Sequence, residues 1–173
     1  MEKSSKKDRF AFDTSALISL ATISLIDKLL GFVEVVVTPS VIAELEEFAR
    51  FDDKYGKASK TVLKYAENFT IAKGYIKETI RFIGKTGNEL YNAAKQESLA
   101  IITDDIKFSR HVKGKAETRF STYFLVALVV SGNISKDKAL ELLGSLREIR
   151  NWQSNIIYLV AKKELGQLKD NFD

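Results

Sequence analysis

The chain has 173 residues, of which 45% are hydrophobic and 29% charged, and this composition is typical of one globular domain rather than a disordered chain. Cysteine is absent, which excludes disulfides, thiolate metal sites and cysteine nucleophiles. The formal net charge of +4 permits a polyanionic partner without requiring one. The longest apolar run, residues 123–130, is too short to span a bilayer, and no secretory signal is predicted, so we expect a cytoplasmic protein without a membrane partner.

Short apolar runs, typical of buried strands, alternate with longer stretches in which apolar residues recur at helical spacing. The predicted strands are residues 10–13, 33–38, 69–72 and 99–103. The predicted helices are residues 14–30, 40–50, 57–68, 86–98, 106–112 and 118–130, followed by two amphipathic helices that begin after residue 135 and near residue 153. Residues 73–87 are compatible with either a helical turn or a loop. Strands and helices in alternation predict an α/β fold with a parallel sheet.

Individual residues predict where several helices begin and end. Thr14 or Ser15 is expected to cap the first helix, and Gly31 to end it. Thr38, directly before the only proline, and Ser135 are expected to cap two later helices.

Acidic residues stand at the ends of predicted strands or in the first turns of the helices that follow them. They are Asp13, Glu44, Glu89 and the pair Asp104 and Asp105. In a parallel α/β sheet these positions share the carboxyl edge, where ligands bind. Neighbouring strands lie about 4.8 Å apart, so clustered carboxylates would repel unless a proton or a cation were present. Mg²⁺ or Mn²⁺ is the expected cation, because cysteine is absent and a single histidine cannot build a zinc site.

Each of these acids also has an ordinary structural interpretation. Glu89 near a helix start is favoured by the helix dipole alone. Glu44 lies at the edge of the apolar face predicted for Val41, Leu45 and Phe48, and it can be an ordinary acid of a first helical turn.

Basic residues follow the paired aspartates closely. We expect a nucleic-acid backbone to contact Lys107, Arg110, Lys113, Lys115 and Arg119. A solvated helix face with a mobile turn would give the same pattern.

The sequence resembles the PIN-domain ribonucleases, including the VapC-like proteins of archaea and bacteria, in the order and spacing of four segments. These are Phe-Asp-Thr-Ser-Ala (12–16), Val-Ile-Ala-Glu-Leu (41–45), Gly-Asn-Glu-Leu-Tyr-Asn-Ala-Ala (87–94) and Ile-Ile-Thr-Asp-Asp-Ile-Lys-Phe (101–108). The resemblance implies a PIN-like three-layer sandwich with a central parallel sheet. It implies a catalytic core at 9–120 and extra C-terminal helices at 121–173 that pack on the same domain. The polar residues 1–8 before this core are expected to form a flexible N-terminus.

The resemblance also implies the roles of individual residues. Asp13, Glu44, Glu89 and Asp105 would bind one or two Mg²⁺ or Mn²⁺ ions, although many family members have aspartate where Glu89 stands. Asp104 would share the metal or orient its water. The hydroxyls expected to support these acids belong to Thr14, Ser15 and Thr103.

The function implied is metal-dependent endonucleolytic hydrolysis of single-stranded RNA. Related proteins commonly form homodimers, and those acting as toxins pair with a small antitoxin. An inactive PIN domain that binds RNA or protein is the main alternative. A dehalogenase-like phosphatase would need a second aspartate where Ser15 stands, and a receiver domain would need paired acids after the first strand.

Overall fold

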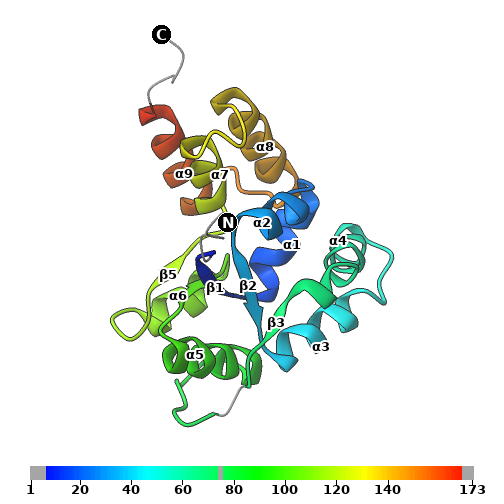
Figure 1. The fold of residues 1–173 in the computed structure, drawn as a ribbon, viewed down its shortest axis with the longest axis vertical. Helices are drawn as coiled ribbons and strands as arrows, with labels where there is room; N and C mark the ends of the chain where they lie inside the picture. Colours follow the sequence, from blue (N-terminus) through cyan, green and yellow to red (C-terminus); the bar gives the residue numbers. More distant parts are fainter. Residues whose placement is uncertain (1–6, 74–75, 169–173) are drawn as a thin grey trace, which may run out of the picture. The chain divides into compact units, whose positions relative to one another are not determined.

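The computed structural model describes residues 7–73 and 76–168 and divides into two compact units, residues 1–119 and 120–173. The first unit contains a five-stranded, all-parallel β-sheet, and helices connect its strands along the chain (Figure 1). The predicted α/β class with a central parallel sheet is therefore confirmed. The predicted flexible N-terminus lies outside the described residues except for Lys7 and Asp8.

The strands lie in the order β3-β2-β1-β4-β5. Their bounds are β1 (Arg9–Phe12), β2 (Glu34–Val37), β3 (Thr70–Ile71), β4 (Ala100–Ile102) and β5 (Thr118–Arg119). The chain builds outward from β1 to β3 and then crosses to the opposite side of β1 with β4. This reversal makes a topological switch point between β1 and β4, and ligands of open α/β sheets bind at such points.

The four predicted strands are all present, but β5 corrects the prediction of a helix from residue 118. Thr118 and Arg119 pair with Ile101 and Ile102 at the edge of the sheet. A strand of two residues is too short to produce a periodic pattern in the sequence.

The helices of the first unit end nearly where the sequence predicts, with one main exception. They are α1 (Thr14–Thr22), α2 (Ile26–Phe32), α3 (Pro39–Phe48), α4 (Lys54–Leu63), the 3₁₀ turn η1 (Ala66–Asn68), α5 (Lys85–Glu97) and α6 (Ile106–Val112). Thr38 caps α3 as predicted, with its hydroxyl accepting from the Val41 amide. Residues 76–84 contain neither helix nor strand.

The exception is the single helix predicted over residues 14–30, which is wrong. Two helices, α1 and α2, meet there at a bend of 116°. Ser24 has a left-handed φ of 56°, and the amides of Ser24 and Leu25 donate to the carbonyls of Ala21 and Leu20. These bonds form a Schellman-type helix end, which glycine usually signals and which a serine does not reveal. Gly31 lies inside α2 rather than at a helix end.

The prediction for the start of α1 is also wrong. Neither Thr14 nor Ser15 is the cap, because both lie within the first turn and Asp13 is the N-cap residue. The Asp13 side chain makes no capping bond to the helix, so its carboxylate is available for other partners.

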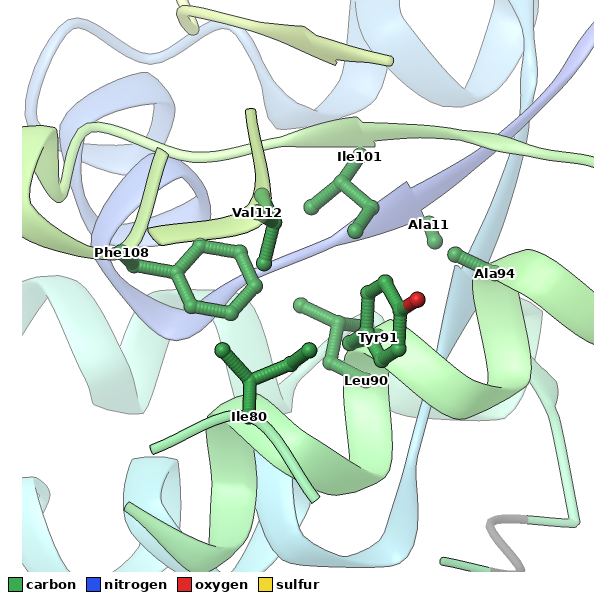
Figure 2. Close-up of a cluster of buried hydrophobic side chains, with 8 residues drawn as sticks. All are labelled: Ala11, Ile80, Leu90, Tyr91, Ala94, Ile101, Phe108 and Val112. Atoms are coloured by element: carbon green, nitrogen blue, oxygen red, sulfur yellow. The ribbon is translucent and has the colours of Figure 1, made fainter. Parts of the chain in front are cut away.

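One face of the sheet packs against α5 and α6. The packed residues, drawn in Figure 2, are Ala11, Ile80, Leu90, Tyr91, Ala94, Ile101, Phe108 and Val112. Because side chains alternate along a strand, Phe12 and Ile102 point to the opposite face. Both are fully buried, so the sheet is covered on both faces, as the predicted three-layer sandwich requires.

The second unit consists of α7 (Tyr123–Val130), α8 (Lys136–Ile149) and α9 (Ile156–Gln167), which contact one another. The predicted cap at Ser135 is confirmed by a bond of 3.1 Å from the Lys138 amide. The helix α9 begins after Asn155, slightly later than predicted. That residues 121–173 belong to the same domain as the sheet stays a prediction.

Among the described residues, no single helix is both long and apolar enough to cross a membrane. Only α1 and α2 taken together reach that combination, and they are bent by 116° relative to each other.

Candidate active site at the carboxyl edge of the sheet

Strand pairing brings the ends of β1 and β4 side by side. Phe12 is in register with Ile102, and the Asp13 amide donates to the Ile102 carbonyl at 2.9 Å. Asp13 and Thr103 are therefore neighbours just beyond the sheet, at the topological switch point. This confirms the prediction that these two strand ends are adjacent.

The Asp13 carboxylate is held by two hydroxyls. Its Oδ2 accepts a hydrogen bond of 2.7 Å from Ser15 Oγ and one of 2.8 Å from Thr103 Oγ1. Each hydroxyl in turn accepts a backbone amide, from Asp104 at 3.0 Å and from Asp105 at 3.1 Å. We call this group of five residues the carboxylate edge. Its bonds run in one direction, from amide to hydroxyl to carboxylate, and fix the position of Asp13.

Glu44 contacts the same region through Thr14. The buried Thr14 hydroxyl donates to Glu44 Oε2 at 2.8 Å, which links the start of α1 to α3. Glu44 lies in the second turn of α3, not in the first turn as predicted, because the helix begins at Pro39. Phe48 was expected on the buried face of this helix, but it is 41% exposed.

Glu89 is buried, with 6% of its surface exposed, and its Oε2 accepts a hydrogen bond from the hydroxyl of Ser40. It too lies in the second helical turn rather than the first, since α5 begins at Lys85. Sequence reasoning missed Ser40. The available signal was a hydroxyl directly after Pro39, in the first turn of the helix that carries Glu44.

The paired aspartates differ in their surroundings. Asp105 is exposed and caps α6, with Oδ1 accepting from the Phe108 amide at 3.0 Å. Asp104 is buried, with 8% exposed. The two residues therefore do not form one equivalent pair.

Charge and burial act together on Asp13. Burial raises the pKa of the Asp13 carboxyl, and the nearby carboxylates of Glu44 and Asp105 raise it further. The hydrogen bonds from Ser15 and Thr103 act in the opposite direction, because they stabilise the charged form. Ionised Asp13 is thus well hydrogen-bonded but surrounded by charge of its own sign.

The potential metal ligands at this edge are all oxygen atoms, which hard divalent cations prefer. A bound cation would also offset the like charges of Glu44 and Asp105, which add to the effect of burial in raising the pKa of Asp13. Within residues 7–73 and 76–168, however, no three acidic or histidine side chains lie close enough together to hold a metal ion. Glu44, Glu89 and Asp105 are directed instead toward Thr14, Ser40 and the start of α6. A metal held by several of these acids requires their side chains to reorient.

The five predicted nucleic-acid contacts fall into two groups. Lys115 pairs with Glu78 at 3.5 Å, and Arg119 pairs with Glu117 at 2.6 Å. The other three are exposed on α6 or just after it, and these are Lys107, Arg110 and Lys113.

A surface pocket lies beside Glu44 that the sequence did not indicate. It is lined by Glu44, Glu47, Phe48 and Phe51. The two phenylalanines are 41% and 57% exposed, so this pocket places apolar rings next to one candidate acid, Glu44.

Comparison with known proteins gives limited similarity. No protein-family model matches the chain, and no curated protein matches it. Among solved structures, a chain of VapBC-1 from nontypeable Haemophilus influenzae is 18% identical, with a TM-score of 0.46. The match covers 66% of this chain and 98% of that one. A likeness of this degree does not identify a family.

Proposed function

We propose that the chain is a PIN-domain ribonuclease that hydrolyses phosphodiester bonds of single-stranded RNA with the aid of Mg²⁺ or Mn²⁺. The observation that carries the proposal is the state of Asp13. Two hydroxyls hold its carboxylate at the switch point of a parallel sheet. Burial raises the pKa of this carboxyl, and the like charges of two nearby carboxylates raise it further. Folding alone gains nothing from such like charges, whereas a bound cation would offset their repulsion.

Asp13, Glu44, Glu89 and Asp105 would hold one or two ions, with Asp104 beside them. When bound, the metal would activate a water molecule and stabilise charge on the attacked phosphate.

The roles of the hydroxyls follow from their contacts. Ser15 and Thr103 keep Asp13 in one orientation, and their amide partners fix the hydroxyls themselves. Thr14 and Ser40 donate hydrogen bonds to Glu44 and Glu89 and hold these side chains. Outer groups of this kind orient metal ligands, and their loss costs about 10–100-fold in metal affinity or activity.

The exposed cations of α6 and the turn after it, Lys107, Arg110 and Lys113, would guide the RNA backbone. Binding should then weaken steeply as salt rises, because each phosphate contact releases counterions.

The decisive experiment is the substitution Asp13→Asn in the full chain. It preserves the shape of the side chain but removes its charge. We expect Mn²⁺-stimulated cleavage of an unstructured RNA to fall by more than the roughly 100-fold upper limit for an outer partner. The matched control is Asp52→Asn, which changes an aspartate that is 88% exposed and should cleave normally. Equal cleavage by Asp13→Asn and the unsubstituted protein would refute the proposal.

A second candidate function is an inactive PIN domain that binds RNA or protein. The observation that favours it is the separation of the acids, three of which are directed to other partners. Calorimetric titration with Mn²⁺ separates the two candidates. Heat of binding that disappears in Asp13→Asn supports the nuclease, and weak binding that is identical in both proteins supports the inactive module.

The VapC-like resemblance adds two proposals about partners, a homodimer and a small antitoxin. Sedimentation of the purified chain tests the homodimer.

A further inference from the structure

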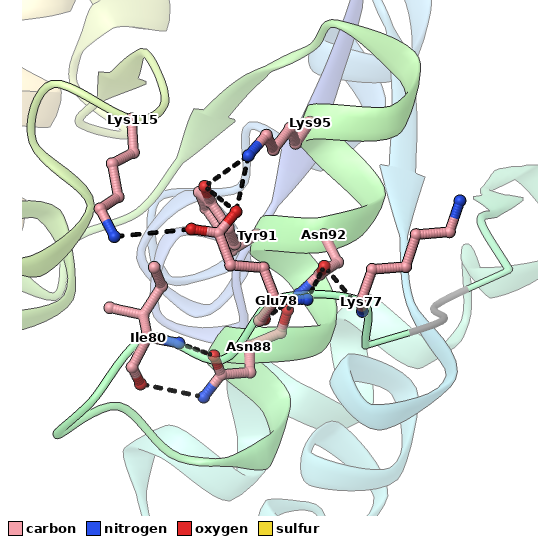
Figure 3. Close-up of polar contacts among 8 residues, drawn as sticks. All are labelled: Lys77, Glu78, Ile80, Asn88, Tyr91, Asn92, Lys95 and Lys115. Atoms are coloured by element: carbon pink, nitrogen blue, oxygen red, sulfur yellow. Dashed lines mark hydrogen bonds and ion pairs between the residues drawn. The ribbon is translucent and has the colours of Figure 1, made fainter.

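Residues 77–84 are fastened to α5 by two asparagine side chains. Asn92 Oδ1 accepts the amides of Lys77 and Glu78, both at 2.9 Å, and its Nδ2 donates to the Glu78 carbonyl at 2.7 Å. Asn88 Oδ1 accepts the Ile80 amide at 2.6 Å. Its Nδ2 lies within hydrogen-bond distance of the carbonyls of Ile80, Ile83 and Gly84. Figure 3 shows part of this arrangement, which we call the amide network.

Two further contacts strengthen the attachment. Ile80 is buried in the cluster that also contains Phe108 and Leu90 (Figure 2). Glu78 accepts hydrogen bonds from Tyr91 and Lys95 and pairs with Lys115 (Figure 3). The segment is therefore a fixed part of the structure, although it has no helix or strand.

This fixed segment presents Phe82 to solvent. Phe82 is 72% exposed and is the most exposed of the large hydrophobic residues described. Its φ of 69° is in the left-handed region, which is unfavourable for a bulky residue. Burial does not compensate for this cost, because the ring is mostly in solvent. Strained backbone of this kind is concentrated at binding sites.

One cationic and one aromatic side chain lie next to the Phe82 ring. The Arg81 guanidinium lies 5.2 Å from the ring centroid, and the His111 ring lies 5.9 Å away at an angle of 51°. His111 Nδ1 is 2.7 Å from the Lys107 carbonyl, a contact that orients its ring. We call Arg81, Phe82 and His111 the Phe82 platform.

The platform is close in the fold to the candidate active site. His111 lies on α6, which begins at its cap Asp105, and six residues of helix span about 9 Å. Phe82 precedes α5, the helix that carries Glu89. The exposed Lys107, Arg110 and Lys113 lie on the same helix as His111 or just after it.

We infer that the Phe82 platform stacks a base of single-stranded RNA next to the carboxylate edge. Bases of unpaired RNA stack on aromatic rings and on arginine, and both surfaces are present here. The neighbouring cations favour a polyanion over an apolar protein segment. This inference deepens the proposed function by adding a base-binding subsite to it.

The test measures binding without cleavage. A labelled oligoadenylate is titrated by fluorescence anisotropy in EDTA, with every variant made in the Asp13→Asn background. Phe82→Ala should bind roughly 5- to 150-fold more weakly, equivalent to about 1–3 kcal/mol for one stacked base. Phe82→Trp should keep the affinity.

Two controls exclude a folding defect and a general loss of aromatic surface. Phe82→Gly removes the ring while accepting the left-handed φ without strain, so it should stay folded and bind as weakly as Phe82→Ala. Tyr158→Ala removes another ring that has two cations near it, Arg147 at 5.6 Å and Lys162 at 5.9 Å. It should bind like the parent.

A probe with the same phosphates but no bases separates stacking from charge. The parent and Phe82→Ala should bind this abasic strand equally. Two results would overturn the inference. One is that Phe82→Ala binds oligoadenylate as tightly as Phe82→Trp does. The other is that Phe82→Ala loses the same affinity for the abasic strand as for oligoadenylate. Unchanged RNA binding would point instead to a protein partner for this surface.

The same measurements keep this inference separate from the proposed function. Ring-dependent binding by a protein that cleaves nothing in Mn²⁺ would retain the platform and refute the nuclease. Cleavage that depends on Asp13 but not on Phe82 would support the nuclease and refute the platform.

Discussion

Asn88 and Glu89 are adjacent in α5, yet they belong to opposite kinds of polar network. Asn88 is neutral, and its amide is surrounded by backbone donors and acceptors of residues 80–84. Glu89 is a buried carboxylate that receives a hydroxyl from Ser40 and lies on the side of α5 that meets α3. One helix therefore supports both the amide network and the candidate acids.

The comparison distinguishes polar groups that stabilise the fold from polar groups that lower its stability. Buried amides with complete hydrogen bonding cost little and fix one conformation. Carboxylates near charge of the same sign cost stability at neutral pH unless a cation is bound. Both kinds of contact fix the chain, but at the carboxylate edge Asp13 lies near charges of its own sign, whose repulsion a bound cation would offset.

The largest expected effect comes from breaking the amide network. Asn88→Ala leaves the Ile80 amide and several carbonyls without their partner, which should cost about 2–4 kcal/mol of stability. In a chain of this size Tm should fall by roughly 5–15 °C. Thermal unfolding followed by circular dichroism checks this. Asn133→Ala, which removes an exposed asparagine bonded to Ser131, should leave Tm nearly unchanged.

At the carboxylate edge we expect a substitution that raises Tm, by less than Asn88→Ala lowers it. Folding raises the pKa of Asp13, so the folded protein favours the protonated acid and loses stability as pH rises through that pKa. Asp13→Asn escapes this loss and should unfold at a higher temperature than the unsubstituted protein at neutral pH without divalent ions.

The same variant has a defined pH dependence. Its advantage should shrink as pH falls below the pKa of Asp13, because the carboxyl of the unsubstituted protein is then neutral too. Mn²⁺ should stabilise the unsubstituted protein but not the variant. A lower Tm for Asp13→Asn at neutral pH would contradict the view that this carboxylate burdens the fold.

The hydroxyls that hold Asp13 should also determine the pKa of its carboxyl. Ser15→Ala removes the 2.7 Å bond that stabilises its charged form, so the pKa of Asp13 should rise further. Titration of the carboxyl carbon by NMR measures this shift directly. Ser145→Ala, which removes an exposed hydroxyl that donates to the Glu141 carbonyl of its own helix, should leave the pKa of Asp13 unchanged.

The smallest effect is expected at the exposed end of the amide network. The hydrogen bond from Lys95 lowers the pKa of Glu78, with smaller contributions from Tyr91 and Lys115. The stabilisation is therefore present above the unfolded pKa and is lost as pH falls through the folded value. Glu78→Gln should lower Tm slightly at neutral pH, and not at all in acid or at high salt. A large decrease that persists in high salt would show that packing, not charge, is the main contribution.

The sequence predicts the adjacency of the ends of β1 and β4 better than it predicts the helix ends. Asp13 and Thr103 each follow an apolar strand, and pairing of parallel strands makes such residues neighbours. The break at Ser24 could not be predicted, because a left-handed serine leaves no glycine signal. Glu44 and Glu89 lie in the second helical turn rather than the predicted first turn, and each helix begins one residue before its predicted start.

The least predictable features depend on contacts between distant segments. Ser40 meets Glu89 only because α3 and α5 pack together. Phe82 looks like an ordinary core residue in the sequence, between Ile80 and Ile83. It is instead 72% exposed, with a left-handed φ, in a segment whose backbone Asn88 binds on both sides of it.

The strand order also determines when the carboxylate edge can form during synthesis. The partner of β1 on one side, β2, follows after about two dozen residues, but Thr103 lies 90 residues beyond Asp13. Chains emerge from the ribosome N-terminus first, and pairings between distant segments close late. A nascent chain that has completed β1, β2 and β3 has Asp13 without its Thr103 hydroxyl and without Asp105. The enzyme we propose would therefore gain its activity with the pairing of β4, and shorter nascent chains would be inert toward RNA.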